Sequence, residues 1–360
     1  MVTFEHTPDF GHLRRTLLRQ GPPGRVPFIE LFADVPIMEA VVGEKFPEGF
    51  DRESRARACD LTIQFYRQLG YDYVCAILII PLNRALVTAE DTAVSGSTRY
   101  WQNENMGVIT SWEEFESYPW PSVDDIDYWA IEYTAQHLPE GMQVIAQSGG
   151  GVLEWVMWMM GYQPFAFALM EQPDLIEAMF AKIEELTTAA CANAVDIPGV
   201  GAYFFGDDMG FTNSTMISPR HLRQYVFPIQ KKLVDITHAK GLPFLLHSCG
   251  NITAIMDDLI DYVGIDGKHS FQDKIMPVEE ASRRWGDRIS MLGGVDMDVL
   301  GRGTEEEVRA RTRQILDFCG PRGGYCLGSG NSVASYIPVR NYLAMLDEGY
   351  RWNQEHFGQG

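Results

Sequence analysis

Short apolar runs alternate along the chain with longer stretches of helical pattern. Eight runs are rich in β-branched or aromatic residues and predict strands: Val26–Leu31, Tyr73–Ile79, Gln143–Ala146, Ala202–Phe205, Pro243–Leu246, Gly264–Lys268, Ile289–Leu292 and Gly324–Leu327. The stretches between them predict helices: Arg52–Leu69, Pro173–Val195, Pro219–Lys240, Ile252–Tyr262, Val278–Trp285 and Thr304–Cys319. Strands that alternate with helices pair in parallel, and eight such units predict an α/β fold, a single (β/α)8 TIM barrel.

We expect residues 1–25 to form an N-terminal helical extension that covers this barrel. A doubly wound open sheet is the alternative architecture. No Gly-x-Gly-x-x-Gly follows the first predicted strand, which weighs against a dinucleotide-binding sheet. Residues 1–360 are therefore expected to form one domain.

Composition narrows the classes of function. The 360 residues carry 29 Lys+Arg against 49 Asp+Glu, a formal charge of −20, which disfavours nucleic-acid binding. No apolar run is long enough for a transmembrane helix, and the first residues lack the pattern of a secretory signal. The six cysteines are too sparse for a disulfide scaffold. A reduced, cytoplasmic protein is expected, and the oligomeric state is left open, a homodimer included.

Polar or ionisable residues follow nearly every predicted strand. They are Glu30, Gln147, Asp207, Asp208, His247, Cys249, His269, Asp296, Cys326 and Ser329. The carboxyl ends of the strands form the functional face of a (β/α)8 barrel, so these side chains are expected to meet there. Many of them are of metal-ligand type.

The pattern His247-Ser248-Cys249 ends an apolar strand. Residues two apart on an extended chain point to the same side, so an imidazole and a thiol are placed together. Cys326 ends a strand three positions further round the predicted barrel. One imidazole and two thiolates would form a three-ligand zinc site with an open fourth position. The alternative is that all three side chains pack as ordinary strand-end residues.

Three segments together resemble the uroporphyrinogen decarboxylase superfamily: His247–Asn251, Met291–Asp296 and Tyr325–Ser332. The resemblance extends over roughly residues 25 to 350 and is to the zinc-dependent methyltransferase branch that works with corrinoid proteins. It implies a (β/α)8 barrel, a zinc ion held by His247, Cys249 and Cys326, and a partner protein that carries cobalamin.

The decarboxylase branch itself is a poorer match. It carries an arginine-bearing loop after its first strand, whereas Leu31–Pro36 contains no arginine. It also carries a histidine in its last strand-end motif, where this chain has Ser329. Porphyrinogen decarboxylation is therefore disfavoured.

The resemblance leaves two enzymatic readings. Zinc could polarise the ether oxygen of a methoxylated substrate while cob(I)alamin takes the methyl group, or it could activate a thiol such as coenzyme M that accepts a methyl group from methylcobalamin. We favour O-demethylation of a small methoxylated aromatic compound, because the segment Val152–Met160 with Phe165 and Phe167 could form an apolar wall. Arg84 or Lys268 could instead hold the sulfonate of a thiol cofactor. A non-catalytic zinc-binding module is a third reading.

Roles follow for the remaining candidates. We expect His269 to donate to a substrate oxygen, with a histidine satisfied by backbone carbonyls as the alternative. We expect Asp207 to act in catalysis, either directly or by supporting His247. The helix-capping alternative for the adjacent Asp207 and Asp208 stays open. Residues expected to contact substrate are Glu30, Gln147, Glu154, Trp155, Asp208 and Ser329. Glu154 and Asp296 are candidates for a fourth zinc ligand.

Overall fold

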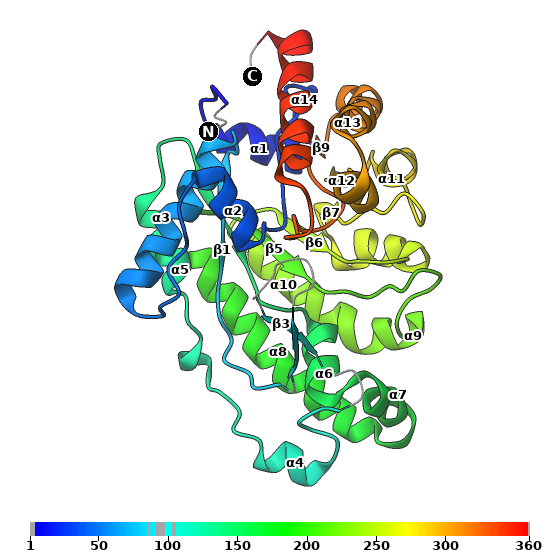
Figure 1. The fold of residues 1–360 in the computed structure, drawn as a ribbon. Helices are drawn as coiled ribbons and strands as arrows, with labels where there is room; N and C mark the ends of the chain where they lie inside the picture. Colours follow the sequence, from blue (N-terminus) through cyan, green and yellow to red (C-terminus); the bar gives the residue numbers. More distant parts are fainter. Residues whose placement is uncertain (1–3, 85, 91–97, 103–105, 359–360) are drawn as a thin grey trace.

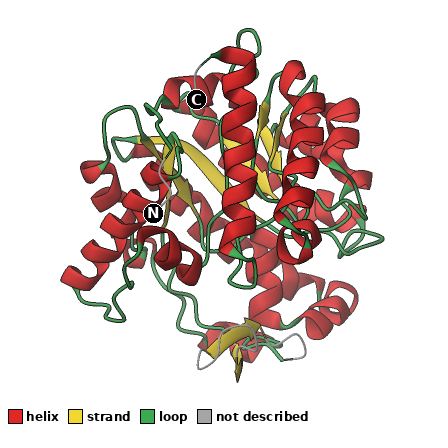
Figure 2. Cartoon of the chain, turned by 45° about the horizontal axis from the view of Figure 1, so that its top comes forward, coloured by secondary structure: helices red, strands yellow, loops and turns green. Residues whose placement is uncertain are grey.

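Seven parallel strands form a curled sheet with helices around it in a computed structural model, which describes residues 4–84, 86–90, 98–102 and 106–358 (Figures 1 and 2). The sheet order is β1-β4-β5-β6-β7-β8-β9. The strands are β1 (Tyr73–Ile77), β4 (Gln143–Gln147), β5 (Val200–Gly206), β6 (Phe244–His247), β7 (Gly267–His269), β8 (Ser290–Leu292) and β9 (Tyr325–Cys326). The predicted α/β barrel is confirmed.

The segment 26–31 occupies the eighth place of the barrel without forming a regular strand. The Ile29 N–H donates to the Leu327 carbonyl at 2.8 Å, and the Leu327 N–H donates to the Pro27 carbonyl at 2.8 Å. On its other side, side chains of β1 contact the segment: the Cys75 thiol lies 3.3 Å from the Leu31 carbonyl. Pro27 has no N–H to give to a ladder, which explains why the predicted strand is reduced to single bridges.

Fourteen α-helices are present in the described part of the chain. They are α1 (Phe10–Leu17), α2 (Val35–Val42), α3 (Arg52–Gln68), α4 (Trp112–Ser117), α5 (Trp129–His137), α6 (Val152–Met160), α7 (Tyr162–Glu171), α8 (Pro173–Asp196), α9 (Pro219–His221), α10 (Phe227–Ala239), α11 (Val278–Trp285), α12 (Met297–Arg302), α13 (Glu305–Cys319) and α14 (Val339–Phe357). Among the described residues, none of these helices is both long and apolar enough to cross a bilayer.

Two predicted helices are less regular than expected. The helix predicted over Pro219–Lys240 is divided by a π-helical turn, Leu222–Val226, that immediately precedes α10. Pro228 lies in the first turn of α10 and has no N–H for the preceding ladder, which accounts for the change in hydrogen bonding. The helix predicted over Ile252–Tyr262 is a short 3₁₀ turn followed by a π-helical segment, Asp258–Val263.

An antiparallel hairpin was not predicted from the sequence. It consists of β2 (Leu86–Glu90) and β3 (Thr98–Gln102) and lies apart from the barrel strands (Figure 2).

The helix α1 covers the amino-terminal end of the barrel, as expected for the N-terminal extension. The Ser290 hydroxyl at the start of β8 donates to the carbonyls of Thr16 and Leu17 at 2.9 and 2.7 Å. Arg14 reaches the loop before β6 and donates to the Gly241 carbonyl at 2.7 Å. These contacts leave the opposite, carboxyl-terminal end of the strands free of this helix.

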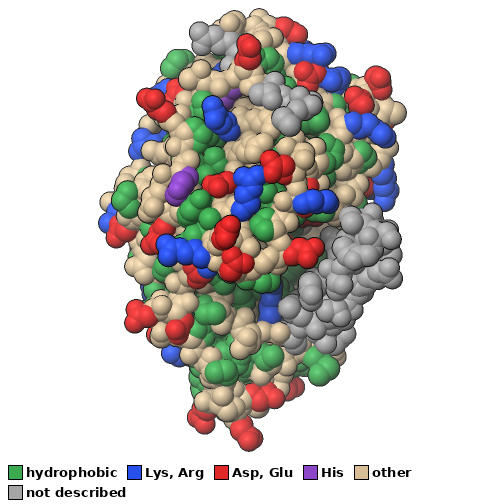
Figure 3. All heavy atoms as spheres, turned by 60° about the vertical axis from the view of Figure 1, so that its left-hand side comes forward, with side chains coloured by type: hydrophobic (Ala, Val, Ile, Leu, Met, Phe, Trp, Pro, Cys, Tyr) green, Lys and Arg blue, Asp and Glu red, His purple; other side chains and the backbone are tan. Residues whose placement is uncertain are grey.

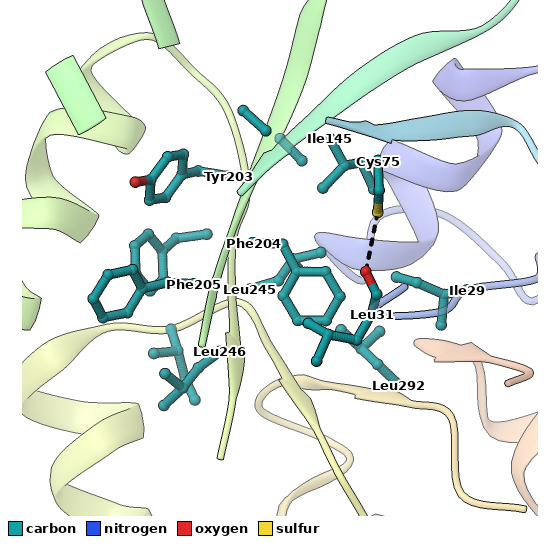
Figure 4. Packing of buried hydrophobic residues seen from close by; sticks show 14 of the residues in the cluster. Ile29, Leu31, Cys75, Ile145, Tyr203, Phe204, Phe205, Leu245, Leu246 and Leu292 are labelled. Atoms are coloured by element: carbon teal, nitrogen blue, oxygen red, sulfur yellow. Dashed lines mark hydrogen bonds between the residues drawn. The ribbon is translucent and has the colours of Figure 1, made fainter. Parts of the chain in front are cut away.

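Alternate residues of the strands supply two apolar layers (Figure 4). Phe204 and Leu245 point into the barrel, whereas Tyr203, Phe205 and Leu246 point toward the surrounding helices. All five are fully buried. The interior layer fills the barrel below the carboxyl-terminal ends of the strands, so a site at that end must lie above it.

Candidate active site and metal centre

A cavity of about 360 Å³ opens at the carboxyl-terminal end of the strands. Polar groups reach it from β4, β5 and β6, and apolar side chains complete its wall. The lining residues are Leu31, Phe32, Ile77, Gln147, Ser148, Gly149, Gly150, Glu154, Trp158, Phe204, Gly206, Asp208, His247, Cys249 and Asn331. This is the end of the barrel at which the fold class places chemistry.

Two buried histidines meet at adjacent strand ends. His247 of β6 lies in register with His269 of β7, and their Nδ1 atoms are 2.8 Å apart. His269 Nε2 lies 3.2 Å from the Ser329 carbonyl oxygen. Because a carbonyl only accepts, His269 carries its proton on Nε2 and accepts at Nδ1 from the Nδ1–H of His247. The lone pair of His247 is therefore on Nε2.

That free nitrogen faces a thiol and a carboxylate. His247 Nε2 lies 3.3 Å from Cys249 Sγ and 3.6 Å from Asp208 Oδ1, and the three ligand-type atoms lie within 4.8 Å of one another. The Cys249 N–H donates to Asp208 Oδ1 at 2.7 Å, which fixes the carboxylate beside the thiol. The i, i+2 spacing of His247 and Cys249 brings them together as predicted.

Burial favours the uncharged forms of His247 and Cys249 when no metal is bound. Burial, and then nearby Lys268, lowers the pKa of His247 to about 3. Burial, and then Asp208, raises the pKa of the Cys249 thiol to about 12. A bound cation would favour the thiolate, since metal binding and deprotonation of a cysteine are coupled.

The donor set fits zinc. One imidazole nitrogen, one sulfur and one carboxylate oxygen make three protein ligands, with the cavity side left for a fourth. Donors around tetrahedral zinc are separated by roughly 3.3–3.6 Å, as its bond lengths require. The hydrogen bond from His247 Nδ1 to His269 is the kind of contact that orients a metal-binding imidazole.

Asn331 is the cavity residue that sequence reasoning missed at this cluster. Its Nδ2 donates to Cys249 Sγ at 3.0 Å, and the Ser270 hydroxyl lies 3.8 Å from the same sulfur. Both donors stabilise a thiolate. An asparagine in the loop Gly328–Asn331 forms no ligand pattern in the sequence, whereas the nearby Cys326 is of metal-ligand type.

The structure does not bring Cys326 to His247 and Cys249, and its prediction as the third ligand is corrected. Its thiol is fully buried, and among the charges that affect it are those of Asp72 and Arg25, near the amino-terminal end of β1. The strands of a (β/α)8 barrel are tilted relative to the barrel axis. Residues that pair from one strand to the next therefore lie progressively further from the carboxyl-terminal mouth. Strand pairing connects His247 of β6 to Cys326 of β9 across three successive strand pairs. Cys326 therefore lies below the mouth of the barrel.

Asp207 is a helix cap and does not line the cavity. Its Oδ1 accepts from the N–H groups of Leu153 and Glu154 at 3.0 and 3.1 Å, and its Oδ2 accepts from Gln230 Nε2 at 2.8 Å. A Cβ at Gly151 would lie 2.3 Å from the carboxylate, so glycine is required for this close approach. The predicted catalytic role is replaced by the capping alternative.

His269 also has a different position from the one predicted. It is fully buried behind His247, and both of its ring nitrogens have partners, so it does not point at a substrate. It orients His247. Asp296 caps α12 by accepting from the Asp298 N–H at 2.8 Å and also accepts from the Asp273 N–H at 2.7 Å, and it is not part of the donor cluster.

Of the predicted substrate contacts, Gln147, Glu154 and Asp208 line the cavity. Glu154 accepts from the Gly151 N–H at 3.0 Å. Burial, and then the charges of Asp208 and Asp207, raises the pKa of Glu154 well above its usual value. The buried Glu154 carboxyl therefore holds its proton more strongly than an exposed glutamate does.

Glu30 and Ser329 lie behind the wall of the cavity. The buried Glu30 carboxylate accepts from the Ser329 N–H at 2.9 Å and from its hydroxyl. Burial raises the pKa of Glu30 to about 8, against these hydrogen bonds. The contact between Glu30 and Ser329 joins the segment 26–31 to the loop after β9. Both residues therefore support the wall of the cavity and do not contact a substrate in it.

The aromatic wall is formed by Trp158 rather than Trp155. Trp155 is buried beside it, and its indole N–H has no hydrogen-bond partner among the described residues. The Arg84 guanidinium lies over both indoles, 4.4 Å from the Trp158 ring centre and 5.5 Å from that of Trp155. A cation therefore stands next to the apolar wall.

Comparison with known proteins finds a matching family model, curated relatives and a solved structure of the same fold. A family model described as uroporphyrinogen decarboxylase (URO-D) matches residues 38–352. The chain is 23% identical over 191 residues to a uroporphyrinogen decarboxylase of Anaeromyxobacter dehalogenans, covering 52% of this chain and 51% of that protein. It is 26% identical over 180 residues to the methylcobamide:CoM methyltransferase MtaA of Methanosarcina barkeri, covering 48% and 50%. The chain thus spans about half the length of the curated relatives it matches.

A solved structure shares the fold over most of the chain. A methyltransferase from Methanosarcina mazei superposes with a TM-score of 0.68 at 18% identity, covering 94% of this chain and 97% of that one.

Proposed function

The chain belongs to the uroporphyrinogen decarboxylase family, and we propose that it is a zinc-dependent methyltransferase. In this proposal, residues 1–360 act as one domain that takes a methyl group from a small methoxylated aromatic compound and passes it to the cob(I)alamin of a corrinoid protein. The observation that carries the proposal is the cluster of His247, Cys249 and Asp208 at the mouth of the barrel.

These three residues would hold the zinc ion, with Asn331 as the donor beside Cys249. Bound there, zinc supplies a Lewis acid that polarises an ether oxygen. His269 keeps the lone pair of His247 on Nε2 and so keeps the site ready for the metal.

The cavity would bind the substrate through its apolar wall. Phe32, Ile77 and Trp158 offer flat or apolar surface to an aromatic ring, while Gln147 and Glu154 offer polar contacts deeper in the cavity. An apolar wall would also limit water beside the reacting groups, which reduces side reactions of a reactive nucleophile.

The transfer balances with one proton from the protein. The carbon–oxygen bond of the methyl ether breaks, and the electron pair of cobalt(I) forms the new cobalt–carbon bond. The oxygen leaves with the bonding pair, and Glu154, a cavity carboxyl whose pKa is raised by burial, would give it a proton. Free phenol and methylcobalamin are the products.

Two lines of support separate this reaction from other chemistry of the family. Among the described residues, the lining of the cavity includes two carboxylates and neither arginine nor lysine. Arg84 beside the aromatic wall is then a single cation for a porphyrinogen with several acidic side chains. A volume of about 360 Å³ also suits a single small ring.

Methyl transfer from methylcobalamin to a thiol is the second candidate. It is favoured by the name of the Methanosarcina barkeri relative and by Arg84, which lies at the aromatic wall and could hold a sulfonate. In that reaction, the thiolate sulfur attacks the methyl carbon and cobalt(I) leaves with the bonding electrons.

One experiment distinguishes the two directions. The zinc-loaded protein is mixed with a reduced corrinoid and a panel of methoxyarenes, and loss of cob(I)alamin absorbance is followed. A parallel arm offers coenzyme M with methylcobalamin. Methylation of cob(I)alamin by an aryl ether supports the proposal, whereas consumption of methylcobalamin by the thiol without any response to ethers supports the second candidate.

A further inference from the structure

A second cavity lies at the other end of the barrel from the donor cluster. It measures about 300 Å³ and is formed where α1, the loop that follows it and the loop before β9 meet. Figure 1 shows α1 and β9 side by side at this end. Its residues take no part in the function proposed above.

Positive charge is concentrated in this cavity. Arg15, Arg19, Arg25, Arg322 and His12 line it, and its lining residues, all within the described part of the chain, include no carboxylate. The whole chain has a formal charge of −20. On the face in Figure 3, by contrast, acidic and basic side chains are interspersed. A basic concavity on an acidic protein is a local attraction for anions.

Two of these arginines are open to a ligand. Arg322 is exposed, and its guanidinium lies 5.1 Å from the Phe318 ring centre. Arg15 comes no closer than 3.8 Å to Asp9, and 54% of its side chain is exposed. Arg25 is different, because Asp72 already holds it at 2.7 Å.

The third arginine is placed by an unusual backbone. Arg19 has φ of 53°, the left-handed region that an arginine rarely adopts. Its Nη1 donates to the Gly323 carbonyl at 2.9 Å and its Nη2 to the Arg322 carbonyl at 3.4 Å, which leaves the remaining N–H groups for a ligand. A Cβ at Gly324 would lie 2.0 Å from that same Nη1. Burial, with Asp287 and Arg322 as opposing influences, lowers the pKa of Arg19. A strained residue and a glycine together hold this guanidinium beside the cavity.

We propose that this cavity binds a diphosphate group, with Arg15, Arg19 and Arg322 as its ligands. Guanidinium groups match phosphate oxygens with paired hydrogen bonds, and three of them suit two adjacent phosphates. The group could belong to inorganic pyrophosphate or to the end of a nucleoside diphosphate, since both present the same chemistry.

Calorimetric titration of the full chain with pyrophosphate and with ADP tests the proposal. Arg322→Gln and Arg15→Gln should each weaken binding about tenfold, the effect of losing one charge-assisted contact. Arg340→Gln is the matched control, because Arg340 is exposed on α14 outside the cavity. Binding should also weaken as salt is raised.

The outcomes are distinct. Equal affinity for the two probes assigns the site to the diphosphate alone, and tighter binding of ADP assigns it to a nucleoside diphosphate. The absence of binding by the wild-type chain overturns the proposal, as does an equal loss in Arg322→Gln, Arg15→Gln and the control. Circular dichroism checks that each variant is folded, and two exposed arginines give two independent tests.

Discussion

Replacing Asp207 with alanine should destabilise the protein, because this carboxylate holds the start of α6 against the barrel. The change leaves three buried donors, the N–H groups of Leu153 and Glu154 and the Gln230 side chain, without their acceptor. Each such loss costs about 1–3 kcal/mol, so we expect a total of about 3–5 kcal/mol. For a chain of 360 residues, this lowers Tm by about 4–7 °C.

Asparagine at the same position is the matched control. The introduced amide keeps an oxygen for the two backbone donors. Gln230 Oε1 has no hydrogen-bond partner among the described residues, so the glutamine amide can turn over and accept from the new nitrogen. We expect Asp207→Asn to lose less than about 1.5 kcal/mol, the net contribution of one hydrogen bond.

The pH dependence of stability gives a second test of the Asp207 environment. Burial, opposed by hydrogen bonds from Glu154, Gln230 and Leu153, raises the pKa of Asp207 to about 7. The folded protein then keeps a proton that the unfolded chain releases near pH 4, as the ordinary pKa of an aspartate requires. This contribution is complete below about pH 4 and falls by roughly 4 kcal/mol as the pH rises to about 7. Asp207→Asn should lack this part of the pH dependence.

Thermal unfolding followed by circular dichroism, at a series of pH values for the three proteins, measures both effects. An unchanged Tm in Asp207→Ala would refute the capping role. Identical pH dependence of wild type and Asp207→Asn would refute the protonated carboxyl. A folded Asp207→Asn that retains zinc but transfers no methyl group would restore the catalytic role that the sequence predicted.

Three further predictions concern the barrel closure and the metal. Tyr73→Phe should cost about 2–3 kcal/mol by urea unfolding, because the Tyr73 hydroxyl contacts both the N–H and the carbonyl of Glu30, and an unchanged midpoint would be contrary to this. Gly328→Ala should cost about 3 kcal/mol or more in the same assay, since a Cβ there would lie 1.8 Å from the Ile29 carbonyl oxygen, and a neutral result would exclude the close approach. His269→Leu should weaken zinc affinity about 10- to 100-fold in a chelator competition while the fold is kept, and wild-type affinity would exclude its orienting role.

Local spacing explains what the sequence could predict of the site. His247 and Cys249 are two residues apart on an extended strand, so their meeting follows from strand geometry alone. The order of strands and helices likewise predicted the barrel. Both inferences use neighbours in sequence and need no knowledge of how distant segments are aligned.

The wrong predictions for the site arose because the sequence does not show how distant strands are aligned with one another. Because the strands are tilted, Cys326 lies below the mouth of the barrel, and Asn331, five residues later in the sequence, lies at it. No local sequence pattern indicates which of these positions reaches the mouth. Successive side chains of an extended chain point to opposite sides, so one of Asp207 and Asp208 must face the cavity. The sequence does not show which of the two it is. The cap of α6 decides it, because Asp207 is taken by that helix.

Zinc analysis of three purified proteins tests the central claim most directly. The account predicts about one zinc ion per chain in the wild type, a ratio that follows from one cluster of three ligands. Cys249→Ser should lose most of the metal, and Cys326→Ser should keep it, with both variants folded. Loss of zinc from Cys326→Ser, or full retention in Cys249→Ser, would contradict the assignment of the metal centre to His247, Cys249 and Asp208.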